Sequence, residues 1–311
     1  MLQYLIILLD KRSTSFCGLA PSPSSKGEGN CLMPLETLRQ GIRFGMMENL
    51  MIQYVYPEHE LPTEYTEIIE SIDHSKIKPM KDGADVWVSK NIKGIKADVP
   101  VVWRTDKQSL FNSEADIINA LENVPRLNVV LTDVDTFTDE DFRKYKSLLN
   151  VLAEHIENLY AEGKSPQLNL LTDRIMLSKM NNCGAGDTTI TLAPNGKFYV
   201  CPAFYYESEA DCIGDLEHGP DIKNRRLYKL VYAPICRHCD AYQCKRCIWL
   251  NRKTTLEVNT PSREQCIIAH LERNASRDLL NNIRKHGTFM PEQKEIKEID
   301  YLDPFDKKDT W

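Results

Sequence analysis

The chain has 311 residues, of which 42% are apolar and 27% charged, with a formal net charge of −6. This composition predicts a soluble globular protein with one large or two ordinary domains, and the net negative charge argues against general nucleic-acid binding. No apolar run is long enough to span a bilayer. The apolar start has no basic segment before it, so we expect a buried strand there and a cytoplasmic protein whose ten cysteines stay reduced.

The first part of the chain alternates strand and helix signals. Apolar runs predict strands at 4–9, 51–56, 99–104, 127–131 and 167–171, with two extended pieces at 76–80 and 84–89. Helical apolar spacing and N-cap residues predict helices at 34–49, 64–72, 113–123 and 138–162. Five or six strand–helix units favour an α/β fold with a mostly parallel sheet, open or partly closed like a barrel.

Aspartates follow several of these strands. Asp10, Asp133 and Asp135 lie at predicted carboxyl ends, which is where barrels place functional groups. With Cys17, in the loop after the first strand, they are candidates for lining a peptide groove. The alternative is that the aspartates are turn and cap residues and that Cys17 and Cys31 are ordinary loop cysteines.

The alternation stops after residue 180, where a cysteine-rich region begins. Eight of the ten cysteines lie there, at Cys183, Cys201, Cys212, Cys236, Cys239, Cys244, Cys247 and Cys266. The four from Cys236 to Cys247 form two Cys-x-x-Cys pairs, and thiolates spaced this closely can converge on one metal or cluster. A disulfide framework suits small secreted domains better than a chain of this length. The region is therefore predicted to bind metal.

Turn and cap signals indicate how this region folds. The sequence Pro194-Asn-Gly196 between two apolar runs predicts a β-hairpin, which would fold Cys183 back towards Cys201. Ser262 and Gln265 form a capping-box pattern that opens a helix ending near 286–287. Cys266 would lie in the first turns of that helix, where the helix dipole favours a thiolate. The acidic and aromatic segment 287–311 is predicted to be a surface tail.

The order of motifs in the cysteine-rich region resembles the SPASM domain, the C-terminal auxiliary-cluster module of radical S-adenosylmethionine enzymes that mature peptides. The pattern of that family opens with a Cys, a spacer and Gly-x4-Cys, which Cys183 and the segment Gly196 to Cys201 satisfy. The compact four-cysteine group and the distal Cys266 follow in the family's order. Two spacings inside the group are one residue shorter than the commonest form.

The resemblance implies two 4Fe–4S clusters with interleaved ligands. One would be held by Cys236, Cys239, Cys244 and Cys266, and the other by Cys183, Cys201 and Cys247. The fourth position of the latter would be Cys212 or an open site. An open iron could bind a substrate thiol, whereas a closed cluster would suit electron transfer or a structural role.

The part before residue 180 resembles the six-unit barrel that precedes the SPASM domain, with one departure. That barrel carries Cys-x3-Cys-x2-Cys after its first strand, and this chain offers only Cys17 and Cys31 in that loop. Two cysteines at this spacing cannot reproduce the motif, so S-adenosylmethionine is not expected as a cofactor. The implied organisation is a partial (β/α)6 barrel-like domain at 1–180, a SPASM-like metal-cluster domain at 181–286 and the tail at 287–311.

More narrowly, the segments 4–10, 13–17 and 49–57, together with the cysteine-rich region, resemble the CXXX-repeat peptide maturase family. That family is associated with a separate radical enzyme and a short peptide with cysteine at every fourth residue. The resemblance implies an accessory in the maturation of a ribosomally synthesised, post-translationally modified peptide (RiPP). Such an accessory would bind the precursor peptide, relay electrons to the radical enzyme, or do both.

Two other classes of function stay open. Paired Cys-x-x-Cys units also describe zinc sites, which would make the region a peptide- or protein-binding module without a redox role. The other class is a self-standing enzyme whose open-site iron activates a substrate thiol. His238 is expected to be an exposed spacer. Basic residues near the cysteines are expected to stabilise a negatively charged cluster; they are Arg225, Arg226, Lys229, Arg237, Lys245, Arg246, Arg252 and Lys253.

Overall fold

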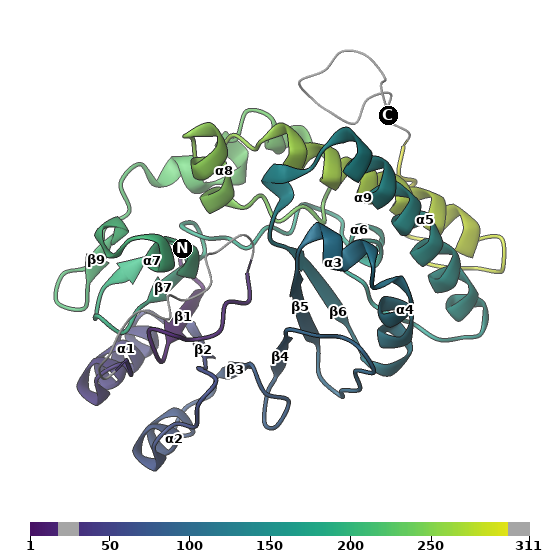
Figure 1. Ribbon diagram of the computed structural model, residues 1–311. Helices are drawn as coiled ribbons and strands as arrows, with labels where there is room; N and C mark the ends of the chain where they lie inside the picture. The colour runs from purple at the N-terminus through teal and green to yellow at the C-terminus, as the bar shows by residue number, and fades with distance from the viewer. Residues whose placement is uncertain (18–30, 298–311) are drawn as a thin grey trace. The chain divides into compact units, whose positions relative to one another are not determined.

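The computed structural model describes residues 1–17 and 31–297 (Figure 1). Contacts within the chain define two compact units, each made of two stretches of sequence. Unit 1 comprises Met1–Ser89 and Cys183–Ala233, and unit 2 comprises Lys90–Asn182 and Pro234–Trp311. The sequence-based division, which cuts the chain at 180 and 286, stays a prediction, and residues 298–311 of the predicted tail lie outside the described residues.

A mostly parallel sheet forms the centre of unit 1. Its strands run in the order β8-β7-β1-β2-β3-β4, and all neighbours pair in parallel except β7 and β8, which are antiparallel. The strands are β1 (Tyr4–Leu8), β2 (Met51–Val55), β3 (Ser75–Lys78), β4 (Val86–Ser89), β7 (Thr189–Leu192) and β8 (Phe198–Tyr199). The continuous apolar run of β1 is explained by its position between β2 and β7, where four of its five residues are buried.

Helix α1 (Leu35–Met47) covers one face of this sheet at close range because two of its residues are glycines. A Cβ at Gly41 would collide with the Leu192 side chain, and a Cβ at Gly45 would lie 2.8 Å from Ile52 Cδ1. Met46, near the end of this helix, is 63% exposed. The other unit 1 helices and short strands are α2 (Thr63–Ile69), α7 (Pro202–Glu207), β9 (Gly214–Asp215) and β10 (Gly219–Pro220).

The predicted hairpin after residue 188 is confirmed. β7 and β8 pair with Thr191 opposite Tyr199, and the turn between them contains Gly196 at a φ of +76°. A left-handed φ of this kind favours glycine, which explains why the Pro-Asn-Gly sequence is a strong turn signal.

Unit 2 combines a parallel strand pair with long helices. β5 (Val101–Thr105) pairs with β6 (Leu127–Leu131), and α5 (Asp139–Ala161) packs along α9 (Arg263–Ile283), as Figure 1 shows. The N-terminus of α5 carries a capping box between Thr138 and Asp141. The remaining helices are α3 (Lys107–Phe111), α4 (Glu114–Asn123), α6 (Thr172–Met176) and α8 (Ile248–Thr255), with short 3₁₀ turns at Val134–Thr136 and Cys236–His238.

Two local predictions in unit 2 are wrong. The segment 167–171 is not a strand, because the chain makes a single bridge from Leu168 to Leu127 and then turns into α6. Thr172 causes this turn, since its hydroxyl exchanges hydrogen bonds with the backbone of Leu168. Ser113 precedes α4 as predicted but does not cap it with its side chain, because its hydroxyl donates to the carbonyl of Ser109.

The fold class is α/β with mostly parallel strands, as the sequence predicts.

Candidate metal-binding site

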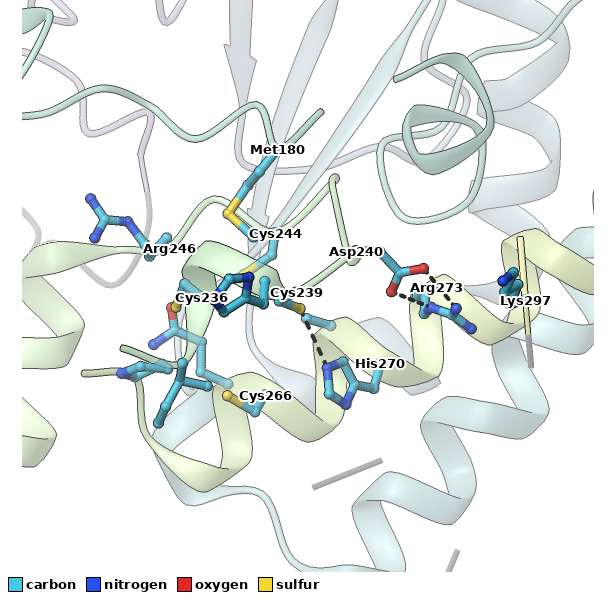
Figure 2. A pocket seen from close by; sticks show the side chains of 15 residues that line it. Met180, Cys236, Cys239, Asp240, Cys244, Arg246, Cys266, His270, Arg273 and Lys297 are labelled. Atoms are coloured by element: carbon cyan, nitrogen blue, oxygen red, sulfur yellow. Dashed lines mark hydrogen bonds and ion pairs between the residues drawn. The ribbon is translucent and has the colours of Figure 1, made fainter. Parts of the chain in front are cut away.

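Four of the predicted ligands line one pocket, and all four belong to unit 2. Cys236, Cys239 and Cys244 come from the segment before α8, and Cys266 comes from α9. The pocket has a volume of about 400 Å³, and Figure 2 shows the four sulfur-bearing side chains around it. They are the set that the resemblance to the SPASM domain implies for one cluster, and the structure places all four in the lining of one pocket. Whether they ligate a metal stays a prediction.

The backbone of residues 236–244 makes two tight turns that bring its cysteines to the same pocket. The N–H of Cys239 donates to the carbonyl of Cys236 at 3.1 Å, and the N–H of Cys244 donates to the carbonyl of Ala241 at 3.0 Å. The first turn spans the pair Cys236-x-x-Cys239 and can present two sulfurs to one centre, whereas the second turn ends at Cys244. Cys247 follows at the start of α8, where its N–H donates to the Gln265 side chain at 3.1 Å.

Helix α9 contributes a second wall of the pocket. Its first turn is capped by Ser262, which accepts from the N–H of Gln265 as predicted, whereas the Gln265 side chain turns to Cys247 and Asn251 and so does not complete a capping box. Cys266 is the fourth residue of the helix, in its first turns as expected. His270 and Arg273 follow it into the pocket lining.

An ion-pair network that includes two buried arginines surrounds the Cys239 turn. Asp240 accepts hydrogen bonds from the guanidinium of Arg273 at 2.7 Å and from that of Arg174 at 3.3 Å. The two arginine side chains are only 1% and 6% exposed, and Arg174 also stacks on the Tyr242 ring at 4.3 Å. Burial alone would raise the pKa of Asp240, but the two guanidinium groups outweigh it and lower this pKa. Asp240 is therefore ionised and fixes the backbone next to Cys239.

Burial dominates the acidity of the thiols themselves. It raises the pKa of Cys236 to about 11 and that of Cys244 to about 12, while the positive charge of Arg246 opposes the shift at Cys236. Without metal, both groups are thus protonated at neutral pH. Binding a metal at these sulfurs requires the loss of their protons, so metal binding would release protons and strengthen as the pH rises.

The chemistry of the four cysteines suits a thiolate-bound metal centre, although their side chains do not converge on a single point. Within residues 1–17 and 31–297, no group of three or more His, Cys, Asp or Glu side chains is arranged to hold a metal ion. The fit rests on the chemistry of the set. Four sulfurs, buried or half-buried, share one cavity with the cationic side chains Arg246 and Arg273, and these charges complement the negative charge of thiolates.

The other candidate ligands differ in exposure and belong to both units. Cys183 is exposed, while Cys201 at the start of α7 and Cys212 after the next turn are half-buried. These three belong to unit 1 and Cys247 to unit 2, so the predicted set of Cys183, Cys201, Cys212 and Cys247 stays a prediction.

The proposed groove residues have observed structural roles. Asp10 is 1% exposed and accepts from the N–H of Arg12 at 2.6 Å, which stabilises the turn after β1. Asp133 accepts from the N–H of Lys107 at 3.0 Å, and Asp135 pairs with Lys253 at 3.3 Å. Cys17 is half-buried. The turn-and-cap interpretation therefore has direct support for two of the aspartates, and the groove stays a prediction.

Sequence reasoning missed three residues of the site. His238 is exposed as expected, and Arg246 lines the pocket as a member of the basic set. However, Arg174, His270 and Arg273 were not singled out. The i, i+4, i+7 spacing of Cys266, His270 and Arg273 on a predicted helix was a signal that could have found two of them. Arg174 lies far in sequence from the four pocket cysteines and offered no such signal.

No protein-family model and no curated protein sequence matches the chain. Its fold is similar to that of a histidine-tagged anSMEcpe with bound AdoMet, with a TM-score of 0.63 and 11% identity over 91% of this chain and 96% of that chain. It is also similar to native anSMEcpe with bound AdoMet and Cp18Cys peptide, with a TM-score of 0.62 and 12% identity over 91% and 99% of the two chains. At such low identity the likeness shows the α/β fold alone. Among the described residues, no helix is long and apolar enough to cross a membrane.

Proposed function

We propose that this chain is an accessory protein in the maturation of a ribosomally synthesised Cys-repeat peptide, and that it works with a separate radical S-adenosylmethionine enzyme. It would contribute by binding the precursor peptide, by relaying electrons through auxiliary 4Fe–4S clusters, or by both. In this proposal, residues 181–286 act as a SPASM-like metal-cluster domain behind a degenerate barrel-like domain at 1–180.

The observation that carries the proposal is the pocket of unit 2. Cysteines from two separate parts of the sequence, Cys236 to Cys244 and Cys266, reach the same cavity. These are the residues that the resemblance to the SPASM domain assigns to one cluster. Cys236, Cys239, Cys244 and Cys266 would hold that cluster, which when bound supplies one-electron transfer.

Fold and sequence together support the accessory role. The chain shares its fold with anSMEcpe, whose solved structures hold AdoMet and, in one case, the Cp18Cys peptide. In contrast, the loop after β1 contains only Cys17 and Cys31, too few thiols for the three-cysteine initiating motif. A chain with the auxiliary cysteine set but without the initiating one would need a partner for radical formation.

Zinc is the second candidate for the pocket, because four thiolates that share one cavity also suit a tetrahedral zinc ion. In that case the region would be a peptide- or protein-binding module without a redox role.

Metal analysis of anaerobically purified protein tests the proposal. About eight irons and eight sulfides per chain, with the broad visible absorption of iron–sulfur clusters, are expected for two 4Fe–4S clusters. Stoichiometric zinc with a featureless visible spectrum would contradict the electron-relay role. The isolated chain is also expected to show no reductive cleavage of S-adenosylmethionine, and cleavage would contradict the accessory role.

A further inference from the structure

One face of α9 carries three different polar groups into the pocket of unit 2. Cys266, His270 and Arg273 have the spacing i, i+4, i+7, which places them on one side of a helix, and all three line the pocket (Figure 2). The His270 and Arg273 residues are 7% and 1% exposed. A buried imidazole with no place in the ligand set needs an explanation, because burying a polar ring is costly unless it is hydrogen-bonded.

The imidazole of His270 faces one particular sulfur. Its Nε2 lies 3.6 Å from Cys239 Sγ, and the N–H of Ala241 donates to the same Sγ at 3.4 Å. Cys239 thus has two nitrogen groups directed at its sulfur, one from α9 and one from its own turn. A sulfur atom accepts at these longer distances because of its size, and an anionic thiolate is the form that gains most from two donors.

The surrounding ion pairs hold both donors in place. Asp240, between Cys239 and Ala241, binds Arg273 through two oxygens at 2.7 Å each. Arg273 is on the same face of α9 as His270, so this pair connects the Cys239 turn to the helix that carries the imidazole. The arrangement fixes the imidazole relative to the sulfur, as an outer-shell partner of a metal ligand requires.

We propose that His270 is a positioning residue of the candidate metal site, and that its Nε2–H donates a hydrogen bond to the Cys239 thiolate. Together with the Ala241 N–H, it withdraws negative charge from this sulfur. On an iron–sulfur cluster, such a bond stabilises the more negative reduced state and so raises the reduction potential. The inference on the potential rests on the proposed function, whereas the hydrogen bond itself applies to any metal bound at Cys239.

The test compares the as-isolated protein with three variants in an electron paramagnetic resonance titration of the clusters. His270→Leu removes the donor, and we expect the ratio of reduced to oxidised cluster at a fixed potential to fall about tenfold, a shift of about 59 mV for one electron. His270→Gln keeps an N–H donor on a side chain of similar reach, so its potential is expected to match the wild type. His286→Leu removes an exposed imidazole that pairs with Glu157 outside the pocket, and it is expected to leave the potential at the wild-type value.

The results separate this inference from the proposed function. If the clusters are present and His270→Leu keeps the wild-type potential, the inference is wrong and the proposed function is untouched. If His270→Leu cannot hold a cluster, His270→Gln decides, because a shifted potential in that variant would overturn the donor role. If metal analysis finds zinc, the proposed electron relay fails. The same variants are then compared by chelator competition, where His270→Leu should bind zinc about 10–100-fold more weakly and equal affinities would overturn the inference.

Discussion

The cysteines of the two units differ in how they are placed. In unit 2, Cys236, Cys239, Cys244 and Cys266 line one cavity, with buried arginines and a histidine in or beside its wall. In unit 1, Cys183 is exposed and Cys201 and Cys212 are half-buried along three different parts of the chain. The comparison teaches that similar cysteine spacings can lie in different surroundings. Unit 2 supplies turns, a helix face and compensating charges, and these give its thiols a shared environment.

The largest expected effect is the loss of a cluster from unit 2. Cys244→Ser replaces a pocket-lining ligand, and a serine oxygen is a poor ligand for a cluster that prefers thiolates. We expect the purified variant to lose about half of its iron and sulfide, about four of each per chain, as measured by metal and sulfide analysis. The matched control is Cys31→Ser, a buried cysteine of unit 1 outside the pocket, which should keep the full content.

Equal iron in Cys244→Ser and Cys31→Ser would show that the pocket of unit 2 does not hold a cluster. Cys212→Ser sharpens the same comparison, because it separates two alternatives for the second cluster. Loss of iron would identify Cys212 as the fourth ligand, and unchanged iron would favour an open site.

The next effect concerns the ion pairs that hold the Cys239 turn. Asp240→Ala leaves the guanidinium groups of Arg174 and Arg273 buried without their shared carboxylate. Removing one member of a buried pair typically costs 3–5 kcal/mol, and because Asp240 is 38% exposed we expect about 3 kcal/mol. The measurement is the free energy of unfolding in urea, in matched wild-type and variant preparations.

Asp278→Ala is the control for that measurement. It breaks a pair between Arg277 and Asp278 on the same helix, where the Asp278 side chain is 59% exposed. Exposed pairs contribute little, so the change should stay within about 0.5 kcal/mol. Similar losses of unfolding free energy in Asp240→Ala and Asp278→Ala would show that the ion pairs beside the pocket stabilise the fold no more than an exposed pair on α9 does.

The most gradual effect is a pH dependence of stability in unit 2. Burial raises the pKa of Glu272 to about 7 from its ordinary 4.5, although hydrogen bonds from Tyr145 and Gln243 act in the opposite direction. Between these pH values the folded state holds a proton that the unfolded chain has lost. The free energy of unfolding should therefore fall as the pH rises from about 4.5 to about 7 and then level off, with an upper limit of about 3.4 kcal/mol for the total loss.

Two variants isolate this contribution in urea unfolding curves taken across that pH range. Glu272→Gln removes the titrating group, so the free energy of unfolding of this variant should not fall between pH values of about 4.5 and about 7. Tyr145→Phe removes a hydrogen bond that lowers the Glu272 pKa, so the decline should continue to a higher pH. Curves for Glu272→Gln that run parallel to those of the wild type would show that another group is responsible.

Much of the local structure could be predicted from sequence because its causes are local. The apolar run of β1, the Pro-Asn-Gly turn and the Thr138 capping box each depend on residues a few positions apart. Predictions failed where a side chain had a competing partner nearby or a distant one. Thr172 bonded back to Leu168 and ended an apparent strand, and Gln265 turned to Asn251 and Cys247 in place of completing a capping box.

By itself, the sequence determined that closely spaced thiols occur in two Cys-x-x-Cys pairs and that Cys266 lies at the start of a capped helix, because turns and helix periodicity are properties of short segments. Only the tertiary structure decided which other groups face those thiols. His270 and Arg273 reach the pocket through the packing of α9, and Arg174 reaches Asp240 across a separation of 66 residues. Such contacts depend on how distant segments pack together, and no local pattern specifies them.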